Sequence, residues 1–204
     1  MARAGITTER LILMGAELAD EVGIERVTLA EVARRFGVKT ASLYSHVANT
    51  AALDDGISLL ALAELAELAT EATSGRAQRE ALAGLANAYR DYALAHPGRF
   101  AAMLRPLTPE VAAASAGPRH ARLTEAVLAG YGLTPEAHPH AVRLIGSTVR
   151  GFITLEAAGG FAHSAPPAAE SWRSIIDALD ALLRNWPAPD SSHHGHTTSE
   201  RNHA

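Results

Sequence analysis

The 204-residue chain contains no cysteine. This absence excludes disulfide bonds and metal sites built on thiolates, and it suits a protein of the reducing cytoplasm. No stretch of about 18 residues is apolar and free of charge, so we expect no membrane-spanning helix. The N-terminus also lacks the apolar segment of a secretory signal peptide. We therefore expect a cytoplasmic protein that has no membrane partner.

Catalytic and cofactor motifs are missing as well. The sequence shows no HExxH pattern, no Ser/His/Asp order and no glycine-rich phosphate loop. It lacks the alternation typical of strands, whereas apolar residues recur at helical spacing over most of its length. With 48% hydrophobic residues, the chain can bury a substantial core. We expect an all-α fold of about nine helices that is not an enzyme and needs no cofactor.

Positive charge is scarce. The formal net charge is −4, and Lys39 is the only lysine. In residues 1–55, six cationic side chains stand against eight anionic ones. However, Arg34 and Arg35 lie near Lys39 in the sequence, so the positive charge is concentrated in one segment. Because nonspecific affinity for DNA scales with the number of phosphates neutralised, we expect it to be modest here.

Residues 28–46 carry the strongest functional signal in the chain. Thr28 and Glu31 have the spacing of a helix-capping box, and Gly37 permits the left-handed turn that ends a short helix. A second short helix follows, with Leu43 on its inner side. This is the pattern of a helix-turn-helix, whose second helix fits the major groove of DNA. The alternative interpretation is a helical hairpin inside a larger α-helical core.

Three segments then resemble a known family. The residues Thr28-Leu-Ala-Glu-Val-Ala, Gly37-Val and Ser42-Leu-Tyr-Ser-His46-Val are similar to the N-terminal domain of TetR-family transcriptional regulators. A predicted amphipathic helix over residues 7–22 fits the same domain. The resemblance implies a DNA-binding head of three helices, followed by a helical body that binds a ligand and dimerises.

The resemblance also implies which side chains contact DNA. Tyr44 and His46 are expected on phosphates. Thr40 and Ser42 are expected at base edges, and Lys39 on a phosphate or a guanine. Two plainer interpretations remain open: the ring of Tyr44 packs beneath its own helix, and His46 is an ordinary surface side chain. The complete set of expected DNA contacts is Arg3, Thr28, Lys39, Thr40, Ser42, Tyr44, His46 and Thr50.

The sequence departs from the family pattern at two places. Ala48-Asn49-Thr50 stands where relatives commonly have a lysine, although Asn49 or Thr50 can still cap the next helix and present backbone donors to a phosphate. Ala30 occupies a position that can carry an arginine in relatives. We expect Arg3, on the N-terminal arm, to supply part of the missing positive charge.

Helical periodicity continues almost to the end of the chain. The helix over residues 49–73 is expected to join the head to the body. Further helices are predicted over residues 76–96, 99–105, 110–115, 119–131, 135–159 (capped by Thr134 and regular after Pro139) and 168–186. The predicted domains are a DNA-binding domain (1–47), a ligand-binding and dimerisation domain (48–186) and a disordered His-rich tail (187–204). The tail resembles a metal-binding tract but is better explained as a solvated tail; its histidines are His193, His194, His196 and His203.

A row of polar rings marks a candidate ligand site. Tyr89, Tyr92 and His96 lie on one predicted helix face, and such groups need partners when they are buried. They could simply pack in the core. We expect them to line a mainly apolar cavity that takes a small apolar or aromatic effector. The full set of predicted lining residues is Tyr89, Tyr92, His96, Phe100, Met103, Leu123, Val127 and Phe152.

Residues 95–100 and 149–156 are similar to a C-terminal regulatory domain of TetR-like proteins that is named for a Trp, a His and a Gly. Gly151 is retained, whereas Gly146 and Arg150 stand in the places of the Trp and the His. Arg150 is either a partner for an anionic ligand or a member of an ion pair, with Glu156 or across a subunit interface.

The last two predicted helices are expected to form a homodimer, because a two-fold interface needs a self-complementary patch. The alternative is that they only close the core of one protomer. The predicted interface residues are Val149, Ile153, Trp172, Ile176, Leu179 and Leu183. Taken together, the sequence predicts a ligand-responsive repressor that binds a palindromic operator as a dimer. Two alternatives remain. One is an activator, or a DNA-binding protein regulated by a partner without a small-molecule effector; the other is a helical enzyme that contains a helix-turn-helix.

Overall fold

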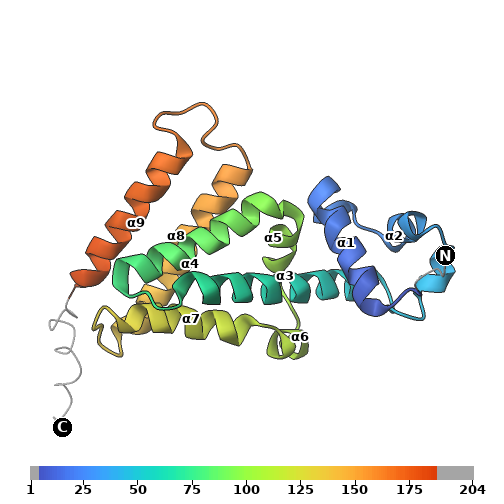
Figure 1. Ribbon diagram of the computed structural model, residues 1–204, viewed down its shortest axis with the longest axis horizontal. Coiled ribbons are helices and arrows are strands. Elements are labelled where there is room, and N and C mark those ends of the chain that lie inside the picture. The colour runs from blue at the N-terminus through green and yellow to red at the C-terminus, as the bar shows by residue number, and fades with distance from the viewer. Residues whose placement is uncertain (1–4, 188–204) are drawn as a thin grey trace, which may run out of the picture.

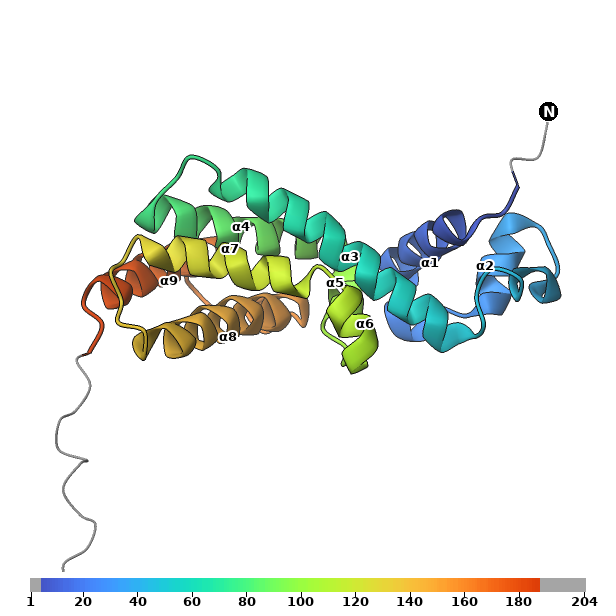
Figure 2. The same ribbon diagram turned by 90° about the horizontal axis from the view of Figure 1, so that it is seen from below.

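The computed structural model describes residues 5–187. Over this range it contains nine α-helices, two 3₁₀ helices and no strand, so the expected all-α fold is confirmed. Figure 1 shows an elongated molecule in which a small head and a larger body share one long helix. Figure 2 shows that the last helix, Ala168–Arg184, ends at the end of the body farthest from the head.

Two α-helices and two 3₁₀ helices make the head. They are α1 (Thr8–Val22), η1 (Ile24–Arg26), α2 (Leu29–Phe36) and η2 (Thr40–Leu43). Both α-helices begin at a threonine cap, because the side chain of Thr7 accepts from the Arg10 amide and that of Thr28 from the Glu31 amide. A side-chain oxygen at this position satisfies a backbone donor that would otherwise lack a partner. The buried apolar side chains of the head include Leu11, Leu18, Val32 and Leu43.

The body consists of seven helices. They are α3 (Thr50–Thr73), α4 (Gln78–Ala95), α5 (Pro97–Met103), α6 (Pro109–Ala114), α7 (Gly117–Ala129), α8 (Ala137–Ala157) and α9 (Ala168–Arg184). Helix α4 is central and packs against α3, α8 and α9. Each of these helices begins and ends within two residues of the predicted position. Apolar periodicity and the Gly and Pro positions therefore located the body's helices correctly.

The head does not close its core alone. Leu53 and Ile57 of α3 and Ala102 of α5 belong to the same buried cluster as the head residues. A boundary at residue 47 therefore divides residues that pack together, and the predicted division into domains 1–47 and 48–186 stays a prediction. The tail, 187–204, lies outside the described residues except for its first residue.

The predicted dimer contacts need correction. Val149, Ile153 and the four named residues of α9 are between 1% and 6% exposed in the single chain, and all six belong to the core of the body. The indole of Trp172 also donates a hydrogen bond to Asn87 Oδ1 on α4, at 2.8 Å. These side chains are already buried by packing within one protomer, so they leave almost no surface for contact with a partner subunit. The six residues are Val149, Ile153, Trp172, Ile176, Leu179 and Leu183.

Candidate nucleic-acid interface

The turn of the motif has the predicted geometry. Gly37 ends α2 in the left-handed conformation (φ 67°), and its amide is bonded back into the helix. Glycine adopts this conformation without the steric cost that a Cβ brings. The capping box is only half formed: Thr28 accepts from the Glu31 amide at 3.2 Å, but the Glu31 carboxylate accepts from Arg34 instead of returning to Thr28.

The second element is shorter than predicted. Instead of an α-helix, the chain forms the 3₁₀ helix η2 followed by one further turn, closed by the bond from the Val47 amide to the Leu43 carbonyl at 3.1 Å. Thr and Ser residues favour regular helix weakly, and 3₁₀ segments are stable only over a few residues. Leu43 (0% exposed) and Val47 (7%) are inward as expected, and they anchor the segment to the head.

The polar side chains of this segment lie at the surface. Lys39, Ser42 and Tyr44 are exposed, whereas Thr40 and His46 are half-buried. The Tyr44 side chain is 57% exposed, so the interpretation that its ring packs beneath its own helix is wrong. The hairpin alternative, in which these groups face an interior, fails for the same reason.

Neighbouring elements hold the segment in place. The hydroxyl of Thr8 on α1 donates to the His46 carbonyl at 3.2 Å. Asn49 caps α3 by accepting from the Ala52 amide at 2.8 Å, which makes Thr50 the first helical residue. The free backbone donors at the start of α3 therefore lie next to the exposed polar segment. Such donors favour phosphate. Arg3 lies outside the described residues.

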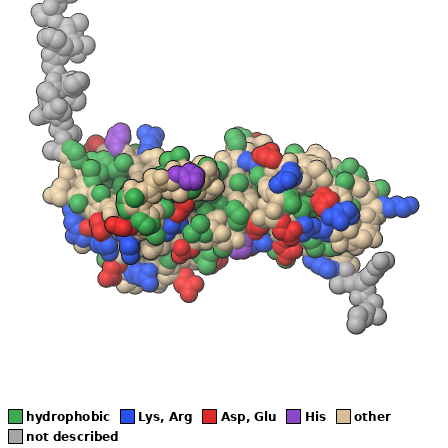
Figure 3. Space-filling view, turned by 90° about the horizontal axis from the view of Figure 1, so that it is seen from above, with side chains coloured by type: hydrophobic (Ala, Val, Ile, Leu, Met, Phe, Trp, Pro, Cys, Tyr) green, Lys and Arg blue, Asp and Glu red, His purple; other side chains and the backbone are tan. Residues whose placement is uncertain are grey.

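The positive charge near this segment is partly neutralised. Arg34 pairs with Glu31 and Arg35 with Glu21, and these hydrogen bonds lower the pKa of both carboxyl groups and raise the pKa of both guanidinium groups. Figure 3 shows positive and negative side chains interspersed over the head. Within residues 5–187, Lys39 has no ion-pair partner. Lys39 is therefore the charge of this segment that is available to a phosphate.

Comparisons with known proteins agree with this geometry. Residues 11–53 match the family described as bacterial regulatory proteins, tetR family, and residues 82–179 match the tetracyclin repressor-like C-terminal domain. An uncharacterized HTH-type transcriptional regulator of Mycobacterium tuberculosis, Rv0681, is 32% identical over 160 residues, which cover 76% of this chain and 72% of that relative. The chain belongs to the TetR family of transcriptional regulators. The expectation that it is not an enzyme is thereby confirmed.

Solved structures share the fold of this TetR-family protein. A TetR variant from Acinetobacter baumannii in complex with minocycline is 24% identical, with a TM-score of 0.66, and the match covers 90% of this chain and 100% of that one. BioQ with its double-stranded DNA operator is 20% identical, with a TM-score of 0.62, and the match covers 88% and 99% of the two chains. At these identities the likeness extends to the fold alone.

A polar joint fastens the head to the body. The carboxylate of Asp20 on α1 accepts from the Arg99 amide at 2.9 Å and lies 3.0 Å from both Arg99 Nε and His96 Nδ1. The same guanidinium contacts Glu64 on α3, whose carboxylate also accepts from the Tyr92 hydroxyl at 2.7 Å. Arg99 is 8% exposed, so it links three elements in a mostly dry setting. Sequence reasoning missed this joint because its members are far apart in the chain.

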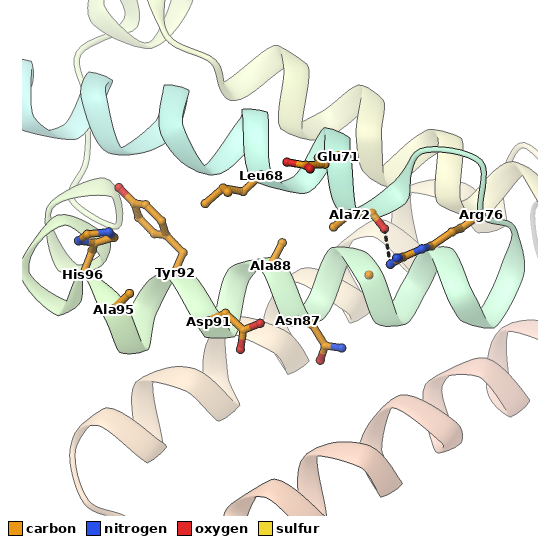
Figure 4. Close-up of a pocket in the computed structure, with 11 residues that line it drawn as sticks. Leu68, Glu71, Ala72, Arg76, Asn87, Ala88, Asp91, Tyr92, Ala95 and His96 are labelled. Atoms are coloured by element: carbon orange, nitrogen blue, oxygen red, sulfur yellow. Dashed lines mark hydrogen bonds between the residues drawn. The ribbon is translucent and has the colours of Figure 1, made fainter.

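The predicted ligand face is divided between two hollows. Tyr92 and His96 line an open groove of about 510 Å³ between α3 and α4, the α3–α4 groove, where Figure 4 shows them beside Leu68. Tyr89 lines a smaller hollow of about 170 Å³ between α4, α7 and α8, the Tyr89–His120 cavity. The remaining predicted lining residues line neither hollow and instead pack in the body: Phe100, Met103, Leu123, Val127 and Phe152. The prediction of a single pocket is therefore wrong. Residues three or four positions apart on one helix can border different spaces, because neighbouring helices lie on both sides of that face.

The Tyr89–His120 cavity contains a buried polar pair. His120 Nε2 lies 2.9 Å from the Leu62 carbonyl oxygen, which can only accept, so Nε2 carries the proton. The other ring nitrogen, Nδ1, then accepts from the Tyr89 hydroxyl at 2.7 Å. Burial raises the pKa of Tyr89 to about 12 and lowers the pKa of His120, so both groups are neutral at pH 7. The sequence interpretation passed over His120, because an isolated histidine on a predicted helix gives no signal.

Two further expectations concern metals and membranes. Within the described residues, no three His, Cys, Asp or Glu side chains are grouped so as to hold a metal ion. The histidines for which a metal tract was considered, His193, His194, His196 and His203, lie outside those residues. No helix between residues 5 and 187 combines the length and apolar character needed to cross a bilayer.

Proposed function

We propose that this TetR-family regulator is a ligand-responsive repressor that binds a palindromic operator as a homodimer in the cytoplasm. The observation that carries the DNA-binding part is the exposed polar segment from Lys39 to His46 at the tip of the head. Its apolar side faces inward, Lys39, Ser42 and Tyr44 are exposed, and Thr40 and His46 are half-buried. In a dimer, two such segments would meet successive major grooves about 34–36 Å apart.

The proposed dimer uses the outer faces of the last two helices. Leu155 on α8 is 55% exposed and Leu182 on α9 is 43% exposed, although most large apolar side chains of these helices are buried. A two-fold interface places the same helix faces of both copies together, and these two leucines would then be covered. These two residues replace the six buried ones as the expected contacts.

The proposed effector site is the Tyr89–His120 cavity, and its position supports a link to DNA. His120 is bonded to the Leu62 carbonyl on α3, the helix that also enters the head. The joint between Asp20, Arg99 and Glu64 connects α1 to α3 and α5. A ligand that prefers a dimer with differently spaced heads would empty the operator. A differential affinity of a few kcal/mol is enough.

The proposal is tested by selecting bound DNA from a genomic library with the purified protein, followed by a reporter assay of the selected promoter with and without the gene. We expect an inverted repeat and a rise in expression when the gene is deleted. A fall in expression would replace the repressor with an activator. The absence of any selected sequence at low ionic strength would overturn the proposal.

A further inference from the structure

Among the described residues that line the Tyr89–His120 cavity, the one charged side chain is positive. Arg150 on α8 lines the cavity. Its positive charge partly opposes the rise that burial causes in the pKa of Tyr89, and it adds to the fall that burial causes in the pKa of His120. Arg119 acts on His120 in the same direction. Within the described residues, no carboxylate lines this cavity. The α3–α4 groove differs, because Glu71 and Asp91 line it.

Arg150 is available to a ligand. Its expected alternative partner, Glu156, accepts two hydrogen bonds from Arg90 on α4, at 2.8 and 2.6 Å. Between residues 5 and 187, Arg150 has no hydrogen-bond or ion-pair partner of its own. A guanidinium group presents a planar set of donors that matches a carboxylate. An arginine without a partner at the edge of an apolar cavity is suited to bind such a group.

The Arg150 guanidinium lies close to a glycine, Gly146. A Cβ placed on Gly146, one turn before Arg150, would have Arg150 Nη2 as its nearest neighbour, at 3.6 Å. Gly146 also lines the cavity. Because it has no side chain, a ligand can enter from solvent beside the Arg150 guanidinium. A larger residue at this position would occupy that approach.

The cavity limits the size of its ligand. Its volume is about 170 Å³, and its apolar walls include Leu85, Val142 and Ile145. A dry cavity of about 150 Å³ is known to hold one benzene molecule. The space therefore fits one aromatic ring or a short acyl chain, with its polar end directed toward the Arg150 side.

We propose that the effector is a small organic acid whose carboxylate pairs with Arg150 and whose apolar body fills the Tyr89–His120 cavity. The inference rests on the proposed function, since it names the chemical class of the effector for that site. The shared chemistry is one carboxylate on a compact apolar body, whether aromatic or aliphatic.

The test is titration calorimetry of the full-length protein at constant ionic strength and pH 7. The probes are benzoate and hexanoate, with benzyl alcohol as the neutral counterpart and benzylamine as the cationic one. We expect at least one acid to bind about 10- to 100-fold more tightly than benzyl alcohol, the range of a hydrogen bond to a charged group. If benzoate binds and hexanoate does not, the natural ligand is aromatic; the reverse result makes it aliphatic.

Three variants locate the site. Arg150→Gln should remove the preference for acids. Arg143→Gln is the matched control, because Arg143 is another exposed arginine of α8 that borders a different hollow, and it should leave the preference unchanged. Gly146→Leu should weaken binding of every probe by filling the approach to the cavity. Thermal melting of each variant establishes that it is folded.

Several results would overturn the inference: neither acid binds, benzyl alcohol or benzylamine binds as tightly as the acid that binds better, or the Arg150 and Arg143 variants behave alike. Loss of the dimer in Arg150→Gln, with acid binding retained, would assign Arg150 to the subunit interface instead. Operator binding, measured separately by fluorescence anisotropy, distinguishes the two proposals. A protein that binds operator but no acid refutes only this inference, whereas one that binds acid but no operator refutes only the proposed function.

Discussion

Replacing Gly98 by alanine should push α5 of the body away from α1 of the head and so destabilise the protein. A Cβ at this position would lie 2.0 Å from both the carbonyl carbon and the carbonyl oxygen of Ala19, and 2.5 Å from the Asp20 amide nitrogen. Real Cβ contacts are almost never shorter than 3.0 Å, so α5 and α1 must move apart by about 1 Å. The atoms that obstruct the new methyl group are backbone atoms, which cannot rotate away.

The size of the effect follows from the contacts that this movement breaks. The bond from the Arg99 amide to Asp20 is 2.9 Å long, and a 1 Å separation takes it beyond hydrogen-bonding distance. Overpacking costs about 1–3 kcal/mol, and a lost hydrogen bond to a charged group about 1.5–3 kcal/mol. We expect Gly98→Ala to lower the free energy of unfolding by about 3–5 kcal/mol. The melting temperature should fall by about 10 °C for a chain of this length.

The assay is urea and thermal unfolding, with Gly151→Ala as the matched control. Gly151 is also helical, but a Cβ there has no atom within 4 Å. This variant should be neutral or more stable by up to about 1 kcal/mol, because alanine favours helix over glycine. Equal stability of the two variants would refute the close contact between α1 and α5.

Three further predictions concern other parts of the molecule. Lys39→Gln should weaken operator binding and reduce the slope of log affinity against log salt by about 0.9, the value for one phosphate contact; Arg76→Gln in the body should leave both unchanged. Because burial lowers the pKa of His120, the unfolded state takes up a proton before the folded state does, and stability should decrease as the pH falls below about 6.5. Urea titrations from pH 8 to pH 5 should show this loss to be smaller in His120→Gln, and equal pH dependence of the two proteins would contradict it. Leu183→Ala should lower the free energy of unfolding by about 2–5 kcal/mol, because the side chain is 1% exposed in the single chain. If sedimentation instead shows a stable monomer with unchanged protomer stability, Leu183 belongs to the interface after all.

The sequence by itself determined the helices and the family. Apolar residues at helical spacing, interrupted by Gly and Pro, are a local signal, and they placed each helix of the body within two residues of its position. The helix-turn-helix was readable for the same reason, since the Thr28 cap, the Gly37 turn and the inward Leu43 lie within one short segment. The 3₁₀ geometry of η2 was not readable, because it depends on how η2 packs against α2 and on the burial of Leu43 and Val47 in the core of the head.

Only the tertiary structure decided which side chains share a space. The sequence cannot distinguish whether Trp172 and Leu183 face a partner subunit or the core of their own chain. Helical periodicity identifies the apolar face of a helix but not the element that packs against it. Tyr89 and Tyr92 lie three residues apart and border different hollows. Asp20, Glu64 and Arg99 form one joint. Glu156, considered as a partner for Arg150, instead accepts a hydrogen bond from Arg90. Such contacts join residues dozens of positions apart, so they exist only after the helices have packed.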